Sequence, residues 1–472
     1  MLNEFELIQQ QKIMQRFYSR TTAAAMAEAA SSKRPVGERM RVAIVGGGAA
    51  AMTSALHLAP LVDAGLIAAP IDVYPGDSPI EREIGVGVWS TALTPFLANA
   101  DDDDDATRKR LSHRMVWDEM MHAGLWVGQV GYRTPQGSWL ARSELPTFNH
   151  IHGRFENQDD MPGLLFLREA DMLGTLRRAV QMEEEQQETI QVHPETRVED
   201  IDTKYTGSWS SPLQLTKASS SSPTTLTSER DYHLIVAADG SHSILRRLYG
   251  GHRSAQQQPR LTGTNVFRQG QKQQKEAEVA EQEHRWKQMR QAEANAVEDR
   301  RYSVLRGNAP MTREETGVDG ISFQTWGVGS SMRFATVPML YPDDDSVIER
   351  QVWFATTSDP LVTDESDPLL RKERLMESFS SWHDPITTMM ETTDAQDILM
   401  ERAVAHRHCV DPVINTSGVL QELHGVTPPS RGPGPAMVFV GDSFMTVVRA
   451  FSVSRKRLLL SHTFFVLLLL SL

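Results

Sequence analysis

A short apolar segment followed by three glycines constrains the fold of this chain more than any other feature. Residues 41–45 read Arg-Val-Ala-Ile-Val, which is typical of a buried β-strand. Glycines at 46–48 end this strand, and the alanine-rich run 49–56 favours a helix. A second apolar strand at 71–74 follows at the spacing of a βαβ unit. The N-terminal part of the chain is therefore predicted to be α/β.

The spacing of these glycines indicates what the turn could bind. Gly46, Gly48 and Ala51 form a G-x-G-x-x-A pattern between a predicted strand and a predicted helix. In that context the glycines let a pyrophosphate approach the backbone, and the helix N-terminus contributes partial positive charge. The alternative is a glycine-rich turn in an unrelated α/β protein. The acid that usually binds the ribose is missing because Pro75 stands in its place, and Asp77 is the nearest substitute.

Length, charge and cysteine content exclude several classes of protein. A chain of 472 residues with 40% hydrophobic residues can form two or three domains. The net charge of −13 repels nucleic acids, so none is expected as a partner. The single cysteine, Cys409, excludes an internal disulfide, and we predict no metal site. Residues 1–39 are interpreted as a disordered or targeting extension, with the cytoplasm as the expected compartment and the mitochondrion as an alternative.

Two further strand-associated motifs occur downstream of the glycine-rich turn. One apolar strand runs into Asp239 and Gly240, and another runs into Gly441 and Asp442. With the N-terminal turn, and in this order, they resemble the FAD-dependent aromatic hydroxylases, which are single-component flavoprotein monooxygenases with the para-hydroxybenzoate hydroxylase type of fold. The resemblance implies that Asp239 and Gly240 are associated with binding of both FAD and NAD(P)H. It also implies that Asp442 contacts the ribityl chain of the flavin.

Other segments resemble the same family over most of the chain, from about residue 41 to residue 442. Arg168, at a predicted helix start, resembles the arginine that contacts FAD in that family. The aromatic-rich segment 321–357 resembles strands of its substrate domain, and its alternation predicts antiparallel pairing. Residues 368–391 read as helical with an interruption at Pro385. Residues 206–229 are rich in Ser and Thr and predict an exposed hairpin connection with no core of its own.

The resemblance implies an α/β plus β fold, in which a Rossmann-like FAD-binding domain is interleaved with an antiparallel-sheet substrate domain. Composition predicts an exposed helix over 268–301, which the family comparison makes an insertion. The expected divisions are an extension (1–39), the FAD-binding domain (40–110, 156–260 and 430–446), the substrate domain (111–155 and 261–429) and an atypical tail (447–472).

The implied activity is a monooxygenase reaction that uses FAD, NADPH or NADH, and O2 to hydroxylate a small aromatic or otherwise electron-rich substrate. The family has no universal catalytic side chain, so none is predicted here. Thr325, Phe334 and Thr336 are the predicted substrate contacts, because their strands would cover the flavin ring. The alternatives are a nicotinamide-dependent Rossmann dehydrogenase and a non-catalytic or defective FAD-fold binding protein. The substrate, the choice of nicotinamide and the oligomeric state stay open.

The resemblance stops after Gly441 and Asp442, where the family continues with a proline-containing loop and a helix pointing at the flavin. We therefore interpret the chain as C-terminally truncated relative to the family. With one side of the flavin pocket open to water, the oxygen chemistry is expected to yield hydrogen peroxide instead of product. The basic and leucine-rich segment 455–472 also permits a tail anchor with weak membrane association. Its apolar run is shorter than the roughly 20 residues that a spanning helix needs.

Overall fold

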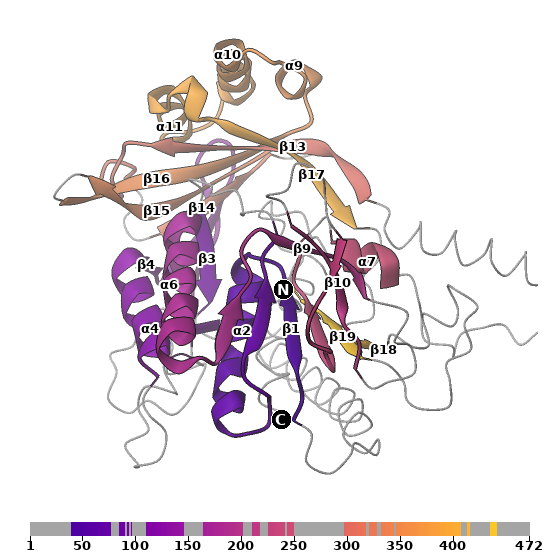
Figure 1. Cartoon of the computed structure of the whole chain (residues 1–472). Helices are drawn as coiled ribbons and strands as arrows, with labels where there is room; N and C mark the ends of the chain where they lie inside the picture. The colour runs from indigo at the N-terminus through magenta and orange to yellow at the C-terminus, as the bar shows by residue number, and fades with distance from the viewer. Residues whose placement is uncertain are drawn as a thin grey trace, which may run out of the picture.

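The fold consists of two large sheets that lie one above the other, as Figure 1 shows. The computed structural model describes residues 39–76, 85–89, 92–93, 96, 110–145, 164–201, 210–217, 225–240, 243–249, 297–317, 321–327, 332–343, 346–406, 413–415 and 435–440. A mostly parallel sheet with helices forms the lower part in this view, and an antiparallel-rich sheet with its own helices forms the upper part. The mixed α/β character predicted from the sequence is confirmed.

The parallel sheet contains six of the described strands in the order β18-β19-β12-β1-β2-β8, and all neighbours except the β18–β19 pair are parallel. The helix α2 follows β1 and leads back to β2, so the predicted βαβ unit is confirmed. The elements are β1 (Val42–Val45), α2 (Ala49–Asp63), β2 (Ile71–Tyr74), β8 (Ile190–Val192), β12 (Leu234–Ala237), β18 (Val413–Asn415) and β19 (Ala436–Phe439).

Both faces of this sheet are covered, which explains why its central strands are apolar throughout. Val42 and Ile44 of β1 face one core, where the sheet packs against α2, α4 (Leu111–Ala123) and α6 (Glu169–Gln187). Ala43 and Val45 face the opposite core. That core lies under α7 (Ile244–Tyr249) and a three-stranded sheet of β9 (Thr196–Ile201), β10 (Leu213–Lys217) and β11 (Thr225–Thr227).

Two sequence-based assignments in this region are wrong. The helix α4 was assigned to the substrate domain, but its Val116 and Met120 are buried in the core that α2 and α6 share. The segment 206–229 was expected to have no core, but Leu213 and Leu215 of β10 are buried under the parallel sheet. The segment is dominated by Ser and Thr, so composition alone did not indicate the alternating apolar residues that make β10 a half-buried strand.

The second large sheet contains seven described strands in the order β17-β13-β16-β15-β14-β5-β6. The predicted antiparallel pairing of β14, β15 and β16 within residues 321–357 is confirmed. The strands are β5 (Gln129–Arg133), β6 (Trp139–Glu144), β13 (Val297–Ala309), β14 (Ile321–Trp326), β15 (Arg333–Asp343), β16 (Ser346–Thr357) and β17 (Leu399–His406).

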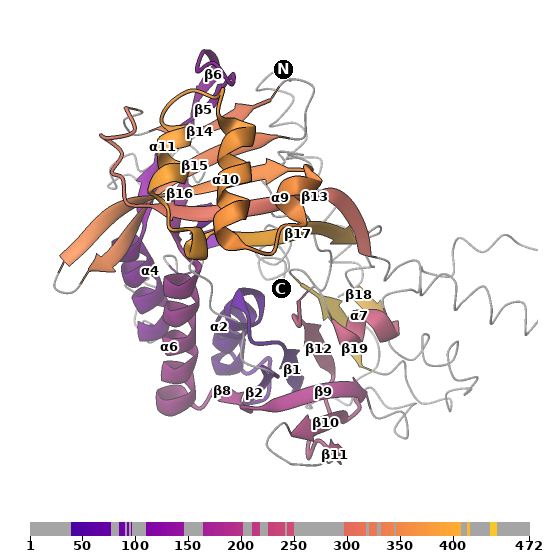
Figure 2. The same cartoon turned by 90° about the horizontal axis from the view of Figure 1, so that it is seen from above.

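Helices cover the outer face of this sheet, as seen from above in Figure 2. They are α9 (Pro360–Thr363), α10 (Pro368–Phe379), α11 (Ile386–Thr392) and the short 3-10 helix η3 (Ala395–Asp397). Asp367 accepts hydrogen bonds from the first backbone N–H groups of α10, which fixes where that helix begins. The prediction of a helical segment at 368–391 interrupted near Pro385 is confirmed.

The predicted helix over 268–301 is wrong at its end, because residues 297–301 belong to the strand β13. Val297, Glu298 and Asp299 pair with β17, and this pairing across the sheet overrides the local helical composition. Residues 268–296 lie outside the described residues.

A small sheet joins the two large ones and consists of β3 (Gly85–Trp89), β7 (Leu164–Arg168) and β4 (Leu125–Val127) in the order β3-β7-β4. Leu164 and Phe166 of β7 pack against Val337 and Met339 of β15. We call this face of the seven-stranded sheet the inner face, and the face toward α10 and α11 the outer face. Gly85 allows the approach, because a Cβ atom there would lie 1.6 Å from Cε of Met339.

The chain path shows which edge of the parallel sheet meets the inner face. The helix α6 begins next to β15, where Arg168 contacts Tyr341, and runs away from it (Figure 1). The next strand, β8, returns parallel to β2 and β1. The carboxyl ends of the parallel strands therefore point toward the inner face, and ligands of open parallel sheets bind at such an edge. None of the helices in the described ranges combines the length and apolarity that a membrane span requires.

Candidate functional site

The glycine-rich turn after β1 packs directly on two neighbouring strands. Gly46 has φ +131°, and its N–H donates to the carbonyl oxygen of Tyr74 at 2.9 Å. A Cβ atom on Gly46 would lie 2.1 Å from the carbonyl oxygen of Ala238. Only glycine combines this backbone conformation with this close approach. Gly46 therefore lets the ends of β1, β2 and β12 meet.

Gly48 has a different environment, although it belongs to the same turn. It is the N-cap residue of α2, and no side chain accepts a hydrogen bond from the first N–H groups of that helix. Among the described residues, a Cβ atom on Gly48 would meet no atom within 4 Å. Ala51, by contrast, is buried in the core beneath the helix. The first turn of α2 thus presents backbone donors to open space, which is the arrangement that binds a phosphate.

Asp239 and Gly240 follow β12 directly, beside this turn. The N–H of Ala238 donates to the carbonyl oxygen of Val45 at 2.7 Å, and Oδ2 of Asp239 accepts from the N–H of Ile244 in α7 at 2.9 Å. The other oxygen, Oδ1, is buried and has no hydrogen-bond partner among the described residues. Burial raises the pKa of Asp239, while hydrogen bonds from Ser243 and the backbone around the start of α7 oppose that rise. A buried acceptor without a partner is costly unless a ligand supplies the donor.

The third motif strand, β19, lies on the far side of β12. It pairs with β12 in parallel, and the N–H of Val440 donates to the carbonyl oxygen of Ala237 at 2.9 Å. The strands that carry the three sequence motifs are therefore adjacent, in the order β19-β12-β1. Gly441 and Asp442 themselves lie outside the described residues, so their predicted contact with the flavin stays a prediction.

Arg168 lies at the junction between the two large sheets. It is the N-cap residue of α6, and its guanidinium donates two hydrogen bonds to Asp171, at 2.7 and 2.6 Å. The same guanidinium lies 5.2 Å from the ring centroid of Tyr341 on β15. These contacts hold Arg168 at the edge where the cofactor was predicted. Its contact with a flavin stays a prediction.

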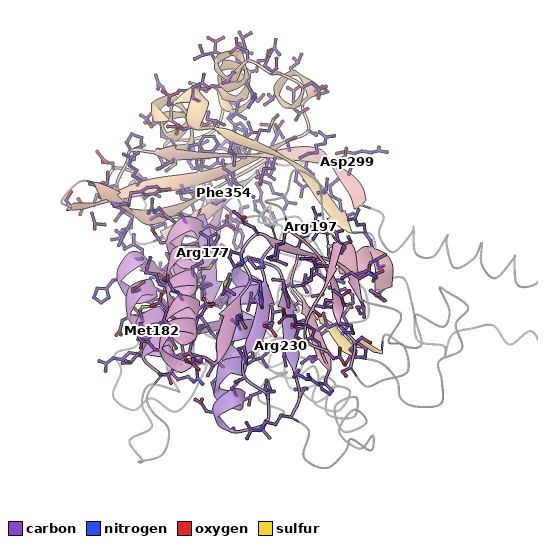
Figure 3. The ribbon with its side chains drawn as sticks, viewed as in Figure 1. Arg177, Met182, Arg197, Arg230, Asp299 and Phe354 are labelled. Atoms are coloured by element: carbon purple, nitrogen blue, oxygen red, sulfur yellow. The ribbon has the colours of Figure 1, made fainter. Side chains whose placement is uncertain are left out.

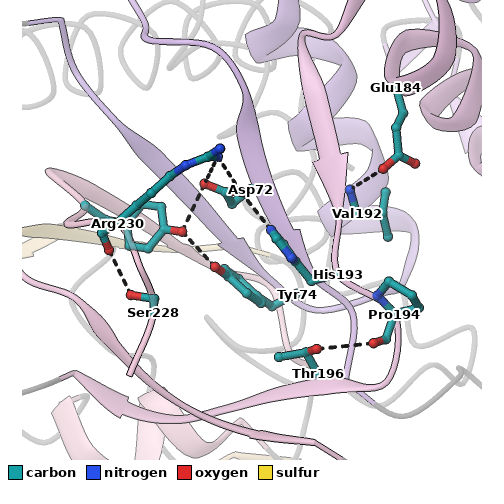
Figure 4. A network of polar contacts seen from close by, with 10 residues as sticks. Asp72, Tyr74, Glu184, Val192, His193, Pro194, Thr196, Ser228 and Arg230 are labelled. Carbon is teal, nitrogen blue, oxygen red and sulfur yellow. Dashed lines mark hydrogen bonds and ion pairs between the residues drawn. The ribbon is translucent and has the colours of Figure 1, made fainter. Parts of the chain in front are cut away.

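Sequence reasoning missed a buried carboxylate on β2, which Figure 4 shows with its neighbours. Asp72 is 1% exposed, and its oxygens accept hydrogen bonds from Arg230 at 2.9 and 3.0 Å and from the Tyr232 hydroxyl at 2.9 Å. Nε2 of His193 lies 2.7 Å from Oδ1. The signal in the sequence was a carboxylate inside an otherwise apolar strand, which requires nearby donors when the strand is buried.

The network around Asp72 extends to the end of β2. The hydroxyl groups of Tyr74 and Tyr232 lie 2.7 Å apart, and the ring of Tyr74 stacks on His193 at 4.6 Å. Burial raises the pKa of Tyr74 to about 12. Pro75, the next residue, packs so closely that a Cβ atom on Gly47 would lie 2.9 Å from it. The Asp72 network therefore fixes the strand end against which the glycine-rich turn rests.

The three predicted substrate contacts lie on the wrong face of the seven-stranded sheet. Thr325 lies opposite Phe334 across the β14–β15 pair, and Thr336 follows two residues later on the same face. Phe334 stacks on Trp353 and packs against Phe379 of α10, which places this set on the outer face. Their side chains are buried away from the carboxyl ends of the parallel strands. The prediction chose residues on the wrong face of the sheet, because alternation cannot show which face meets the other domain.

His383 lies close to this outer core. Its Nε2 lies 3.0 Å from Oγ1 of Thr325, and burial lowers its pKa. Among the described residues, no three His, Cys, Asp or Glu side chains are grouped so that they could hold a metal ion.

The inner face carries a different set of side chains. Arg306 of β13 is 5% exposed, forms an ion pair with Glu401 at 2.9 Å and lies 5.7 Å from the ring centroid of Phe354. Phe354 points from β16 toward the parallel-sheet domain, as labelled in Figure 3. Arg333 and Trp326 lie opposite each other at the end of the β14–β15 pair, also on the inner face. Sequence reasoning did not select these residues, because it fixed no register.

Comparisons with known proteins support the fold without a detectable match in sequence. No protein-family model matches the sequence, and no curated protein matches it. The chain is similar in structure to a single-residue variant of HpxO from Klebsiella pneumoniae in complex with FAD. The two share 14% identity at a TM-score of 0.50 over 87% of this chain and 76% of that one.

A protein from Photorhabdus luminescens described as an FAD-containing monooxygenase is similar with 14% identity and a TM-score of 0.52. The match covers 92% of this chain and 87% of that one. HpxO has also been crystallised with FAD and uric acid, and that structure matches with 15% identity and a TM-score of 0.50 over 87% of this chain and 74% of that one. The present chain therefore has the fold of FAD-containing monooxygenases, as the sequence motifs predicted.

Proposed function

We propose that this protein is an FAD-dependent monooxygenase that uses NADPH or NADH and O2 to hydroxylate a small aromatic or otherwise electron-rich substrate. One observation carries the proposal. The strands that lead into three motifs far apart in the sequence are adjacent in the parallel sheet, and their carboxyl ends point toward the inner face of the second sheet. A Rossmann-like dinucleotide-binding domain under a substrate-covering sheet accounts for this arrangement.

The residues at this edge suit FAD. The space in front of Gly48 and the N–H groups at the start of α2, which no described side chain caps, can hold the pyrophosphate. The buried, unpartnered Oδ1 of Asp239 can accept a hydrogen bond from a cofactor hydroxyl. By resemblance, Gly441 and Asp442 would bind the ribityl chain and Arg168 would lie against the flavin. When bound, the flavin would supply the redox and oxygen chemistry, which no protein side chain provides.

The chain itself has to bind, orient and shield the reactants. Three apolar residues of the inner face are buried against β7: Val337, Val352 and Phe354. They exclude water from the space beside the carboxyl ends of the parallel strands, where the cofactor would bind. On the same face, the buried guanidinium of Arg306 and the partly exposed carboxylate of Glu401 place a charge pair near this region. We assign residues 40–110, 156–260 and 430–446 to FAD binding, together with α4, which shares their core.

The proposal is tested by purifying the full chain and measuring its cofactor content and turnover. We expect a flavin absorption spectrum, release of FAD on denaturation, and NADPH or NADH oxidation that a hydroxylated aromatic substrate accelerates. Retention of a nicotinamide nucleotide without any flavin would instead indicate a dehydrogenase. Bound FAD without substrate-stimulated oxidation across a broad aromatic panel would indicate a non-catalytic binding protein.

A further inference from the structure

The strand β6 forms one end of the seven-stranded sheet, and among the described strands it pairs only with β5 (Figure 2). Every residue from Leu140 to Glu144 is exposed, and Leu140 itself is 60% exposed. A strand edge of this kind presents N–H and C=O groups to which another strand can add, and natural proteins usually cover or interrupt it. An open edge therefore points to a pairing partner.

The hairpin that carries this edge is fixed against the outer core. The ring of Trp139 lies on Gly131 of β5, where a Cβ atom would come within 2.1 Å of Cζ3. At the tip of the hairpin, the backbone N–H of His383 donates to the carbonyl oxygen of Pro135 at 2.7 Å. A strand that is already ordered loses little conformational entropy when it pairs.

The backbone groups of Arg142 and Glu144 point away from the sheet. The N–H of Leu145 donates toward β5, to the carbonyl oxygen of Gly128 at 2.8 Å. Successive residues of a strand direct these groups to opposite sides, so those of Ser143 also point toward β5, and those of Arg142 and Glu144 point outward. The hydroxyl group of Ser143 donates to the carbonyl oxygen of Glu144 at 3.2 Å, which agrees with a carbonyl that β5 does not use.

The same two residues carry opposite charges on one face. Arg142 pairs with Gly131, which pairs with Phe323 of the outer core, so the side chains of Arg142 and Glu144 lie on the outer face. Within the described segments, neither side chain forms an ion pair. Burial lowers the pKa of the neighbouring guanidinium of Arg133, and the positive charge of Arg142 lowers it further. A carboxylate beside Arg142 would relieve this repulsion.

The part of the edge that can pair is short and is centred on Ser143. On one side, the register with β5 shifts so that Leu140 has no counterpart on that strand. On the other side, the sequence has Pro146, which carries no N–H to donate. Residues 141–145 lie between these limits, with Arg142 and Glu144 placed symmetrically about the centre.

We propose that two copies of this chain associate through their β6 strands, which pair antiparallel about a two-fold axis at Ser143. In this register Arg142 lies directly opposite Glu144 of the partner subunit, and the two residues exchange both backbone hydrogen bonds. A two-fold interface has to be self-complementary, and the opposite charges meet this requirement on both sides of the axis. One sheet then runs continuously through both copies. This inference does not depend on the proposed function.

Charge reversal on the purified full chain tests the inference, with sedimentation to measure the dissociation constant of the dimer. We expect the parent chain to form a dimer. Arg142→Glu and Glu144→Arg each place like charges opposite one another and should raise the dissociation constant about 10- to 100-fold. A parent chain that stays monomeric at its highest soluble concentration would overturn the inference, as would variants that associate like the parent.

The two variants should also rescue each other. In a mixture of the Arg142→Glu and Glu144→Arg chains, one copy carries two acidic side chains and the other two basic ones, so opposite charges again lie across the axis. Mixed dimers should form with about the affinity of the parent chain, and so should the chain that carries both substitutions. Failure of either rescue would show that the two residues do not lie opposite each other.

Matched controls reverse the charges of an exposed ion pair on α4, between Arg114 and Asp118. Arg114→Glu and Asp118→Arg change the net charge by the same amounts as the β6 variants and should leave the dissociation constant unchanged. Equal weakening by both sets would mean that net charge governs association, and it would overturn the inference.

A disulfide tests the register itself. Cys409 is the single cysteine, so a Cys409→Ser background is free of thiols. Directly opposite residues of antiparallel strands have Cα atoms about 4.5–5.5 Å apart, which suits a disulfide. Oxidised glutathione should therefore cross-link Ser143→Cys but not Ser380→Cys, which lies at an exposed position after α10. Absence of the Ser143→Cys cross-link, or equal cross-linking of both variants, would contradict the register.

Discussion

At the scale of single residues, the glycine-rich turn divides two tasks between neighbouring positions. Gly46 is required by the fold, because a Cβ atom there would collide with the backbone of Ala238 at 2.1 Å. Within the part of the chain that the structure describes, Gly48 makes no such contact, so these segments tolerate a side chain at this position. A requirement for glycine at residue 48 would therefore come from a ligand and not from packing, which makes this position a clean test of cofactor binding.

We expect Gly48→Asp to fold and to lose the flavin. The carboxylate would occupy the space in front of α2 and would repel a pyrophosphate at the helix N-terminus. The measurement is the ratio of flavin to protein absorbance after gel filtration. Gly174→Asp adds the same charge within α6 and is expected to keep the flavin. A Gly48→Asp variant that purifies yellow would show that the phosphate does not bind here.

A second residue-scale prediction concerns the unpartnered oxygen of Asp239. Asp239→Asn should keep the cap of α7, because an amide oxygen can still accept from Ile244, but a cofactor hydroxyl would lose a charged acceptor. The dissociation constant for FAD should rise about 10- to 100-fold, as measured by fluorescence titration of the apoprotein. Flavin affinity equal to that of the parent chain would contradict this role.

Although Asp239→Asn should weaken FAD binding, we do not expect it to destabilise the apoprotein. Burial raises the folded-state pKa of Asp239, so ionisation of this carboxylate destabilises the folded state as the pH rises above the unfolded value. Asp239→Asn removes that cost. The melting temperature of the apoprotein near neutral pH should therefore be equal to or higher than that of the parent chain, which separates a ligand-binding role from a structural one.

At the scale of elements, the Asp72 network connects β2 with β8 and with the segment before β12, and so positions the turn that precedes α2. Asp72→Asn removes a buried negative charge that accepts several hydrogen bonds. It should lower the free energy of unfolding by about 2–4 kcal/mol. We expect a loss near the lower end of this range, because Arg230 is partly exposed and can be hydrated. Urea denaturation of the apoprotein measures this loss.

An exposed pair provides the matched control for this element. Asp299 accepts hydrogen bonds from Arg402 at 3.1 and 3.2 Å, but both side chains lie on the surface. Asp299→Asn should not change the urea midpoint detectably, because solvent screens such pairs. Equal midpoints for Asp72→Asn and the parent chain would show that the network does not stabilise the fold.

At the scale of the whole molecule, stability depends on histidines buried between the parallel sheet and its helices. Burial lowers the pKa of His57 in α2 to about 3 and also lowers that of His113 in α4. His57 therefore stays neutral in the folded state down to about pH 3, but it takes up a proton on unfolding below about pH 6.5. The stability present above that pH is therefore lost as the pH falls, continuing toward about pH 3 for His57.

His57 should contribute a slope of about 1.4 kcal/mol per pH unit in that window, and His113 adds a slope of the same sign. His57→Phe preserves the packing on Phe96. Between pH 6 and 4.5, we expect it to reduce the slope of the unfolding free energy against pH by the contribution of one buried histidine. Urea denaturation at several pH values measures the slope. Between pH 7.5 and 9 the variant and the parent chain should show the same pH dependence, which serves as the internal control.

The sequence by itself determined the local elements and their order. The strand, turn and helix over 42–63 follow from local apolar periodicity and from glycine, and the antiparallel strands within 321–357 follow from alternation and turn residues. The order of the three motifs was also readable, and it predicted the fold that the solved structures share. These signals need only neighbouring residues, so they are present before the chain is packed.

Only the tertiary structure decided which faces and strand ends meet. Alternation places Phe334 and Thr336 on one face of their strand, but only the register of β14 and β15 puts Thr325 on that face too. Outer-face helices cover this face, and Arg333 and Trp326 lie on the inner face instead. The partners of Asp72 are far away in the sequence: Arg230 precedes β12, and His193 follows β8. The physical reason is that burial and register depend on which distant segments pair, and a side-chain period of two is compatible with either face.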